Sequence, residues 1–457
     1  MFFEQIKTPG LGCFSYLLGC PAAGEAAVVD PRRDIGIYLD LALANGMKIV
    51  EIFETHVHAD HVSGARELAW ATGAAIHIHE SAAVGYPAAG IKHGDRFELG
   101  AAHIRVLHTP GHTPNSVSLV VSDAVRSPEP QMVLTGDLLF VGDTGRPDLP
   151  GEEILAEQVE NLYHSLNTVL GDLPDGLEVY PAHGQGSLCG GGLSAKPHST
   201  LGYERRTNPR LLLQKFEDFS RDVLKELPMR PRSFSAIIAA NLAGPPLLPE
   251  CDGRPPALSP EEVEERREQG AVILDLRPTP AFASAHIPGS FHVDGSQGQA
   301  LNWIGVVVPP GSRLILVLDR DQDFEAKRTE LRRIGYDRLE GWLHQGLNAW
   351  IGSGRPTAGL PLLSAPTLKA RLAGGDPPRL IDVRTAPEAA RFSLPGAERL
   401  PFEDLVAGNF GRPSQPGEAV VVCRSGYRAA IAAALLLAGG WTNLSILAGG
   451  LEALRKV

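Results

Sequence analysis

Short apolar runs alternate with amphipathic stretches along the first part of the chain. Residues 27–29 and 49–53 form apolar runs typical of buried strands, whereas residues 35–44 and 64–72 have the apolar spacing of helices. This alternation predicts an α/β domain. Polar residues that directly follow a strand in such a domain lie at the carboxyl edge of the sheet, where ligand sites gather.

A further stretch, residues 208–227, has helical periodicity and is predicted to form a helix. Proline-rich sequence follows it, first Pro228 and Pro231 and then two proline pairs within residues 245–256. Because proline interrupts both helices and strands, this sequence is interpreted as a linker. The first domain is therefore predicted to span residues 1–245.

Beyond the linker the pattern repeats. Residues 272–277 return as residues 380–384, and each copy continues with a second apolar run, a helical stretch and a glycine-rich end. The shift of about a hundred residues is much longer than a solenoid repeat, so it indicates a tandem duplication of one small α/β domain. We predict two such domains with central parallel sheets, residues 256–356 and 362–457, in an α/β multidomain protein.

Composition narrows the class of protein. The 457 residues are 43% hydrophobic, enough for several cores, and the formal charge of -11 without a basic tract argues against nucleic acid as a partner. No run of 18 apolar residues and no signal-peptide pattern occurs, which predicts a cytoplasmic protein without a membrane partner. The five scattered cysteines are expected to be reduced thiols. The oligomeric state stays open, a homo-oligomer included.

Metal-binding side chains are concentrated in residues 55–61, Thr-His-Val-His-Ala-Asp-His. A mixture of imidazole and carboxylate without cysteine indicates a catalytic metal rather than a closed structural zinc. Three more donors follow at glycine-containing motifs further along the chain. The complete set is His56, His58, Asp60, His61, His112, Asp137 and His183.

This donor set resembles the metallo-β-lactamase superfamily, which implies an αββα sandwich with its metal at one edge of paired sheets. Most members are hydrolases with two zinc ions, and the ligand count alone leaves that chemistry open. The tracts 138–148 and 199–209 resemble the persulfide dioxygenase branch. That resemblance implies one Fe(II) per chain held by His56, His112 and Asp137, with no organic cofactor. The remaining donors would then either support the iron ligands or bind a second metal; they are His58, Asp60, His61 and His183.

Two histidines and one aspartate form a facial triad, which leaves positions on the iron for dioxygen and a substrate sulfur. Arg146 is predicted either to pair with Asp148 or to bind an acidic part of the substrate. Cys189 lies in a glycine-rich loop that resembles a loop of persulfide dioxygenases fused to rhodanese domains. Our hypothesis is that Cys189 handles the persulfide, and the alternative is a bystander thiol.

A second reactive centre is predicted at Cys423, which follows the apolar residues 420–422 and precedes a helical stretch. A thiol at a strand-to-helix turn lies close to helix N–H dipoles, which favour the thiolate. Arginine side chains and loop amides add to a cradle for an anionic persulfide or a thiosulfate. The predicted sulfur-binding residues are Arg424, Ser425, Gly426, Tyr427 and Arg428. The motif resembles the rhodanese family of sulfurtransferases.

The first copy departs from this motif. Aligning residues 318–320 with residues 422–424 puts Asp319 where the nucleophile belongs, and a carboxylate does not carry sulfane sulfur. This copy is therefore predicted to be inactive. Cys13, Cys20 and Cys251 are assigned structural or incidental roles.

Taken over nearly the whole chain, the resemblance implies oxidation of a low-molecular-weight thiol persulfide by dioxygen to sulfite and thiol, coupled to sulfur transfer between thiosulfate, sulfite and thiols. Two alternatives stay open. One is a thiolester hydrolase with two zinc ions, like glyoxalase II, and the other is a sulfur carrier or sensor. The sequence identifies neither the thiol, glutathione or another, nor the direction of sulfur flux.

Overall fold

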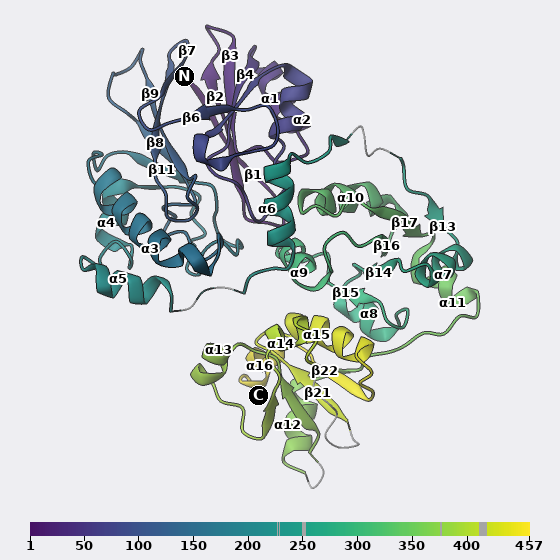
Figure 1. Cartoon of the computed structure of the whole chain (residues 1–457). Coiled ribbons are helices and arrows are strands. Elements are labelled where there is room, and N and C mark those ends of the chain that lie inside the picture. Colours follow the sequence, from purple (N-terminus) through teal and green to yellow (C-terminus); the bar gives the residue numbers. More distant parts are fainter. Residues whose placement is uncertain (226, 228, 249–252, 375–376, 411–417) are drawn as a thin grey trace. The chain divides into compact units, whose positions relative to one another are not determined.

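The computed structural model describes the chain except for residues 226, 228, 249–252, 375–376 and 411–417 (Figure 1). Cys251 lies outside the described residues. The chain divides into two compact units. The first comprises Met1–Asp252 and Thr329–Gly335, and the second comprises Gly253–Arg328 and Tyr336–Val457.

The first unit contains two six-stranded sheets. The first sheet follows chain order and consists of β1 (Phe2–Lys7), β2 (Phe14–Cys20), β3 (Glu25–Val29), β4 (Lys48–Phe53), β5 (Ala75–His79) and β6 (Ala89–Ile91). The second sheet, in the spatial order β12-β11-β10-β9-β8-β7, consists of β7 (Arg96–Leu99), β8 (Ala102–His108), β9 (Val117–Asp123), β10 (Met132–Gly136), β11 (Glu178–Pro181) and β12 (Ser199–Thr200).

Side-chain alternation along the strands explains why these sheets pack face to face. In β2, Phe14, Tyr16 and Leu18 enter the core between the two sheets, whereas Leu17 lies in the core on the outer side. Helices cover the outer faces, with α1 (Gly36–Ala44) and α2 (Ala65–Thr72) on the first sheet. The second sheet carries α3 (Leu155–His164), α4 (Leu201–Thr207) and α5 (Phe216–Val223). The predicted αββα sandwich is confirmed.

One predicted helix is shorter than its periodicity indicated. Residues 208–227 were expected to be helical, but α4 ends at Thr207 and α5 begins only at Phe216. Asn208 precedes Pro209 and adopts an extended backbone, with φ -70° and ψ 119°. A proline disfavours the helical conformation of the residue before it, so the helix ends there despite the apolar spacing. A further helix, α6 (Ser233–Ala243), follows in the chain.

The second unit contains two five-stranded parallel sheets. The first, in the order β13-β17-β16-β14-β15, consists of β13 (Ala257–Leu258), β14 (Val272–Asp275), β15 (Phe291–His292), β16 (Leu314–Val317) and β17 (Leu339–Leu343). The second, in the order β18-β22-β21-β19-β20, consists of β18 (Leu362–Leu363), β19 (Arg379–Asp382), β20 (Ala397–Arg399), β21 (Ala419–Val422) and β22 (Leu444–Leu447).

The identical strand orders confirm the tandem duplication. The central strands β16 and β21 are buried along their whole length, because parallel sheets are covered on both faces by helices. The first copy contains α7 (Pro260–Glu268), α8 (Thr279–Ser284), α9 (Ala300–Val307), α11 (Gly346–Gly352) and α10 (Phe324–Arg333), of which residues 329–333 belong to the first unit. The second contains α12 (Ala365–Leu372), α13 (Ala386–Arg391), α14 (Phe402–Val406), α15 (Tyr427–Ala438) and α16 (Gly450–Leu454).

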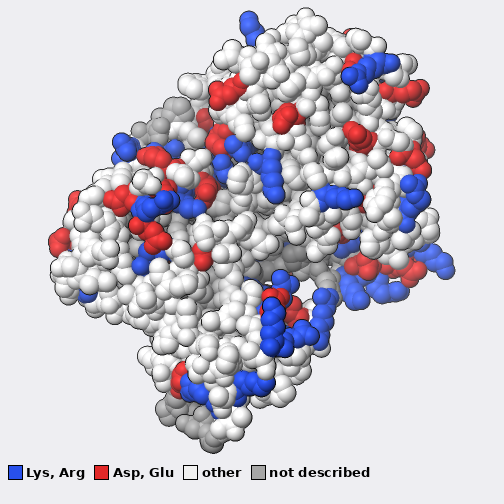
Figure 2. Space-filling view, turned by 180° about the vertical axis from the view of Figure 1, so that it is seen from behind, with Lys and Arg blue, Asp and Glu red and all other residues white. Residues whose placement is uncertain are grey.

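Within the described parts of the chain, none of the helices combines the length and apolarity that a bilayer crossing requires. On the face shown in Figure 2, basic and acidic side chains are interspersed rather than gathered into a continuous basic surface. That face offers no extended positive surface of the kind that tracks a nucleic acid backbone.

Candidate functional site

Three buried side chains converge at one edge of the sandwich. His56, His112 and Asp137 follow the carboxyl ends of β4, β8 and β10, so both sheets contribute to the group. Their donor atoms all lie within 4.8 Å of one another. Asp137 Oδ2 is 3.3 Å from His112 Nε2 and 3.8 Å from His56 Nε2. These are the three residues expected to form the facial triad.

The chemistry of this group suits a metal cation. Asp137 Oδ2 is buried and has no hydrogen-bond partner, which is costly for a carboxylate oxygen unless a cation satisfies it. Burial lowers the pKa values of His56 and His112, and although burial opposes ionisation of Asp137, the surrounding imidazoles hold its pKa well below the usual range. Neutral imidazoles and an ionised carboxylate are the forms that coordinate a metal.

Neighbouring groups orient the two imidazoles. Thr55 Oγ1 donates to Asp30 Oδ2 at 2.8 Å and lies 3.0 Å from His56 Nδ1, so it accepts from the Nδ1–H group. His112 Nδ1 lies 2.9 Å from the Arg146 carbonyl oxygen and donates to it. In both rings the Nε2 lone pair is left free for a metal. Partners of this kind fix the tautomer of metal-binding histidines.

His58 is turned toward carboxylates instead of joining the triad. Its Nε2 atom lies 3.1 Å from Asp30 Oδ1 and 3.1 Å from Glu54 Oε2. Burial opposes its charged form, but these carboxylates raise the pKa of His58 well above the ordinary value. His58 Nε2 is thus paired with carboxylates, whereas His58 Nδ1 is buried without a hydrogen-bond partner, and His58 also lies in a donor group with Asp60 and His61.

His183 joins two carboxylates. Its Nδ1 lies 2.5 Å from Asp137 Oδ1, and its Nε2 lies 2.8 Å from Asp60 Oδ2. Burial opposes the charged form, but the carboxylates outweigh it and raise the pKa of His183 well above its usual value. Asp60 Oδ1 also accepts from His61 Nδ1 at 3.1 Å. Asp60 thus contacts both His61 and His183, and His183 also contacts Asp137.

Cys13 also belongs to this neighbourhood, which the sequence did not indicate. Its Sγ atom lies 2.9 Å from Asp60 Oδ2, and its backbone pairs with that of His183 in an isolated β-bridge. Burial raises the pKa of this thiol well above the ordinary value, so it is protonated and donates to Asp60. No motif surrounds Cys13, and only the pairing of distant segments brings it to the site.

The structure decides between the two interpretations of Arg146. Its guanidinium binds both oxygens of Asp148, at 2.7 and 2.6 Å, and donates to the Leu188 carbonyl at 3.2 Å. The side chain is buried, so it braces the loop that carries Cys189 rather than facing a substrate. Cys189 itself is buried within 4.8 Å of donors on Asp137 and His183, and burial raises its pKa to about 12.

The two tracts that carry the resemblance to persulfide dioxygenases support the same loop. Glu204 accepts from the Gly142 amide at 2.9 Å and from Asn208 Nδ2 at 3.0 Å. Asp143 Oδ2 accepts from the amides of Gly191 and Gly192 at 2.8 and 2.7 Å. Residues 199–209 therefore hold residues 142–148, which in turn hold the glycine-rich loop beside the donor group.

Cys423 occupies the predicted strand-to-helix turn. It directly follows β21, and α15 begins four residues later at Tyr427. Its Sγ atom accepts from the Gly426 amide at 3.1 Å, and Gly426 has a φ of +94°, a conformation that glycine adopts without strain. The loop amides predicted to cradle sulfur thus include one that already contacts the thiol.

The two arginines of the motif are both paired with acidic residues. Arg428 binds Glu388 through two hydrogen bonds of 2.7 and 2.5 Å, and Arg424 Nε lies 3.3 Å from Glu452 Oε1. The positive charge that these arginines were expected to add around Cys423 is therefore offset by carboxylates. The sequence motif did not reveal this, because both acidic partners lie outside it.

Strand register corrects the comparison of the two rhodanese-like copies. Asp275 pairs with Val317 in the first copy, and the equivalent Asp382 pairs with Val422 in the second. Val317 therefore corresponds to Val422, and Leu318, not Asp319, stands at the position of Cys423. The alignment by sequence was wrong by one residue, because apolar runs of similar composition align almost equally well in either register. The first copy still has no thiol at this position.

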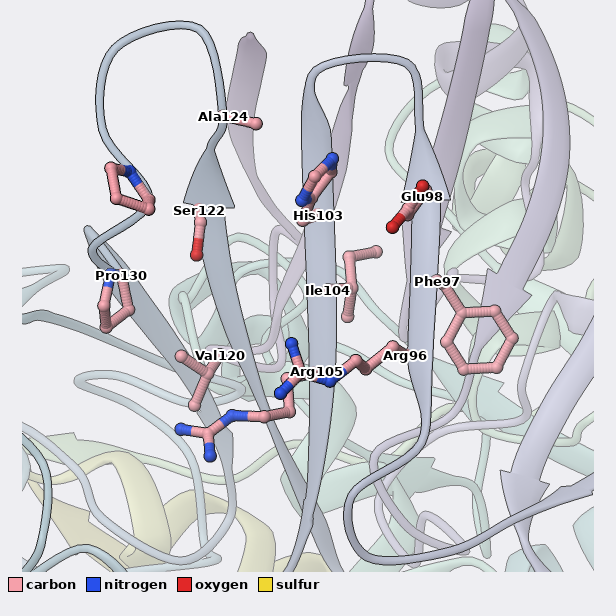
Figure 3. A pocket seen from close by; sticks show the side chains of 11 residues that line it. Arg96, Phe97, Glu98, His103, Ile104, Arg105, Val120, Ser122, Ala124 and Pro130 are labelled. Carbon is pink, nitrogen blue, oxygen red and sulfur yellow. The ribbon is translucent and has the colours of Figure 1, made fainter.

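A hollow of about 410 Å³ on the second sheet of the sandwich is separate from these centres. Figure 3 shows Arg96 and Arg105 side by side on neighbouring strands, with Glu98 and His103 further along. None of the donor groups described above belongs to its lining. The hollow is therefore not the catalytic centre.

Comparison with known proteins agrees with the fold and the donor set, which together indicate an α/β protein with a metal-binding group of side chains and two further α/β domains. The Metallo-beta-lactamase superfamily model matches residues 8–183, and the Rhodanese-like domain model matches residues 259–353 and 364–456. The crystal structure of a metallo-beta-lactamase from Staphylococcus aureus subsp. aureus COL is similar, with a TM-score of 0.68 and 30% identity over 75% of this chain and 98% of that chain. The chain belongs to the metallo-β-lactamase superfamily and carries two rhodanese-like domains.

Curated relatives include two reaction types. The mitochondrial persulfide dioxygenase ETHE1 of Bos taurus is 29% identical over 53% of this chain and 88% of its own length. A hydroxyacylglutathione hydrolase of Polaromonas sp. strain JS666 is 34% identical over 37% of this chain and 61% of its own length. The chain also spans 60% of a beta-lactamase hydrolase-like protein of Agrobacterium fabrum, at 30% identity over 52% of this chain. Membership of the superfamily therefore does not identify the reaction that this chain catalyses.

Proposed function

We propose that the protein oxidises a low-molecular-weight thiol persulfide with dioxygen to sulfite and thiol at a single iron. The same chain then exchanges sulfane sulfur with thiosulfate or a thiol through Cys423. His56, His112 and Asp137 would hold Fe(II), which supplies open positions for both reactants when it is bound. The other donors of the motif keep Asp137 ionised and correctly turned.

One observation carries this proposal over the alternative of a hydrolase with two zinc ions. Two donors outside the triad are engaged in ion pairs, because His58 Nε2 is paired with Asp30 and Glu54, and His183 bridges Asp60 and Asp137. A second metal held by His58 Nε2 or by His183 would have to break these ion pairs. The Asp137 Oδ2 atom is buried and free of hydrogen bonds beside His56 and His112, which supports a metal at the triad.

The match to persulfide dioxygenases and the attached rhodanese-like domains support sulfur chemistry as the shared purpose of the chain. At the second centre, the Cys423 loop provides an amide at 3.1 Å from the thiol sulfur, suited to an anionic persulfide. The domain boundaries 1–245, 256–356 and 362–457 and the catalytic role of Cys423 form part of the same proposal.

The test is a joint measurement of metal content and dioxygen consumption on anaerobically purified protein supplied with glutathione persulfide. About one iron per chain, with dioxygen uptake and sulfite as product, is the expected result. Two zinc ions per chain, no dioxygen uptake and hydrolysis of a glutathione thiolester would instead assign the protein to the hydrolases.

A further inference from the structure

A pocket of about 330 Å³ in the C-terminal unit is lined by both rhodanese-like copies. The first copy contributes Thr279, Asp294 and Gln297, and the second contributes Ser425, Gly426 and Tyr427 from the loop that follows Cys423. Tyr427 Oη donates to the Asp294 carbonyl at 3.4 Å. The first rhodanese-like copy, which has no thiol at the position of Cys423, therefore forms part of the pocket wall beside the Cys423 loop.

The pocket is larger than an inorganic sulfur donor requires. Thiosulfate has five heavy atoms and fills roughly the space of three or four water molecules, at about 30 Å³ each. The remaining volume is bounded in part by apolar side chains, among them Pro280, Leu362 and Ile446. A volume of this size with mixed polar and apolar walls suits a small organic molecule.

The charge in this pocket is negative. Asp294 is buried, and its carboxylate accepts from the Thr279 amide and from the amide and hydroxyl of Ser296, at 3.0, 3.1 and 2.6 Å. A carboxylate offers about four acceptor positions. These three hydrogen bonds therefore leave about one position on Asp294 for a ligand.

No lysine or arginine in the described part of the chain forms an ion pair with Asp294. Lys327 donates to the Gly295 carbonyl at 2.8 Å instead. The adjacent His292 is neutral, because burial lowers its pKa to about 4. The carboxylate would therefore repel a dianion such as thiosulfate and attract an ammonium group.

We propose that this pocket binds the organic thiol partner of Cys423 and selects thiols that carry an ammonium group, which Asp294 holds. Aminothiols of the cysteine and glutathione type meet this description, whereas coenzyme A, with phosphates and no ammonium, does not. The inference rests on the proposed sulfurtransferase function. It also gives the copy without a cysteine a role in substrate selection.

The reaction needs no further reagent. The thiolate of the bound acceptor attacks the terminal sulfur of the Cys423 persulfide, a new S–S bond forms, and the bond between that sulfur and Cys423 Sγ breaks. The bonding pair stays on Sγ, so Cys423 leaves as a thiolate and the acceptor becomes the persulfide. The reverse transfer uses the same pocket.

The test compares cysteine with N-acetylcysteine as acceptors of sulfur from thiosulfate, in the full-length protein and in Asp294→Asn. The variant should lower kcat/KM for cysteine by about fivefold, the contribution of a partly exposed ion pair, and change that for N-acetylcysteine by less than about twofold. Taking the ratio of the two changes cancels the different reactivities of the thiols. With cyanide as acceptor, use of thiosulfate should stay the same or rise.

A second pair of variants keeps the proposal testable if Asp294→Asn fails to fold. Gln297 is exposed and lines the same pocket, so Gln297→Lys and Gln297→Glu change its charge without disturbing a core. We expect Gln297→Lys to disfavour cysteine relative to N-acetylcysteine and Gln297→Glu to do the opposite.

Equal effects on both thiols, or no effect on either, in whichever of these variants fold would overturn the proposal. Failure of the proposed function is distinguishable from failure of this inference. If the unaltered protein forms no thiocyanate from thiosulfate and cyanide, the sulfurtransferase assignment itself is wrong. If thiocyanate forms but the ratio for the two thiols does not respond to the variants, only the assigned selectivity is wrong.

Discussion

His183 Nδ1 lies 2.5 Å from Asp137 Oδ1, and this contact leaves Asp137 Oδ2 as the oxygen that faces His56 and His112. One carboxylate thus has two roles, because one oxygen is held by an imidazolium while the other is buried without a hydrogen bond. The ion pair fixes the rotation of the carboxylate before any metal binds. A contact of this kind preorganises the carboxylate of the triad.

Replacing Asp137 by alanine should separate the two proposed activities. We expect the iron content to fall to a small fraction of one per chain and dioxygen uptake to fall by at least about 100-fold, since a charged ligand is lost. Thiocyanate formation from thiosulfate and cyanide should not change. Asp172→Ala, at an exposed position, is the matched control. Loss of both activities in Asp137→Ala would contradict two independent centres.

Cys423→Ser should produce the reverse pattern. A hydroxyl does not carry sulfane sulfur, so thiocyanate formation should fall to background, while dioxygen uptake with preformed glutathione persulfide stays normal. Cys20→Ser provides a cysteine control outside both candidate centres. Sulfur transfer that persisted in Cys423→Ser would assign the nucleophile to another thiol.

The Thr55 hydroxyl is expected to tune metal affinity without touching the metal. Thr55→Val keeps the shape but removes the acceptor for His56 Nδ1–H, and iron affinity should fall by about 10- to 100-fold. Thr55→Ser retains the hydroxyl and should bind iron nearly as well as the unaltered protein. Competition with a chelator, followed by iron absorption, measures the affinity independently of turnover. Equal affinities for all three proteins would exclude this orienting role.

The ion pair between the buried Arg146 and the partly exposed Asp148 should behave as one unit. Arg146→Met leaves the Asp148 carboxylate without its partner and should lower the free energy of unfolding by about 3 kcal/mol. Adding Asp148→Leu should recover part of that loss, because the unpaired charge is removed. Urea unfolding of the four proteins of this cycle measures the coupling, and strictly additive losses would show that the two side chains act independently.

Glu388 should make the second rhodanese-like domain sensitive to acid. Burial opposes its ionisation, but the Arg428 guanidinium outweighs burial and lowers the pKa of Glu388 to about 2. Because this is below the unfolded value of about 4.3, the stabilisation is complete above about pH 5 and is lost as the pH falls toward 2.

Allowing for partial exposure of the pair, we expect Glu388→Gln to cost about 1 kcal/mol at pH 7 and progressively less below pH 4. Hydrogen exchange of the α15 amides across this pH range measures the difference locally. A difference between the two proteins that is constant from pH 7 to pH 3 would contradict the ion pair as its cause.

Much of the fold could be predicted from local patterns. Strands β4, β14 and β21 lie where apolar runs occur, and the duplicated domain was visible as a repeat, because period and composition are properties of short segments. The failures were local conflicts between signals. Apolar spacing predicted a helix over residues 208–227, but the proline after Asn208 ends the helix there. The alignment of the two copies was shifted by one residue at Leu318, because the neighbouring register is equally apolar.

The sequence by itself determined which chemistry was available, since the donor types of the histidine motif and the thiol at a strand-to-helix turn follow from residue identity and order. Only the tertiary structure decided which of those groups lie together in the triad and which pair with other side chains. His58 pairs with Asp30 and Glu54, Cys13 reaches Asp60, and Arg428 is neutralised by Glu388. These partners lie on separate strands and loops, so their proximity depends on sheet register and packing rather than on spacing along the chain.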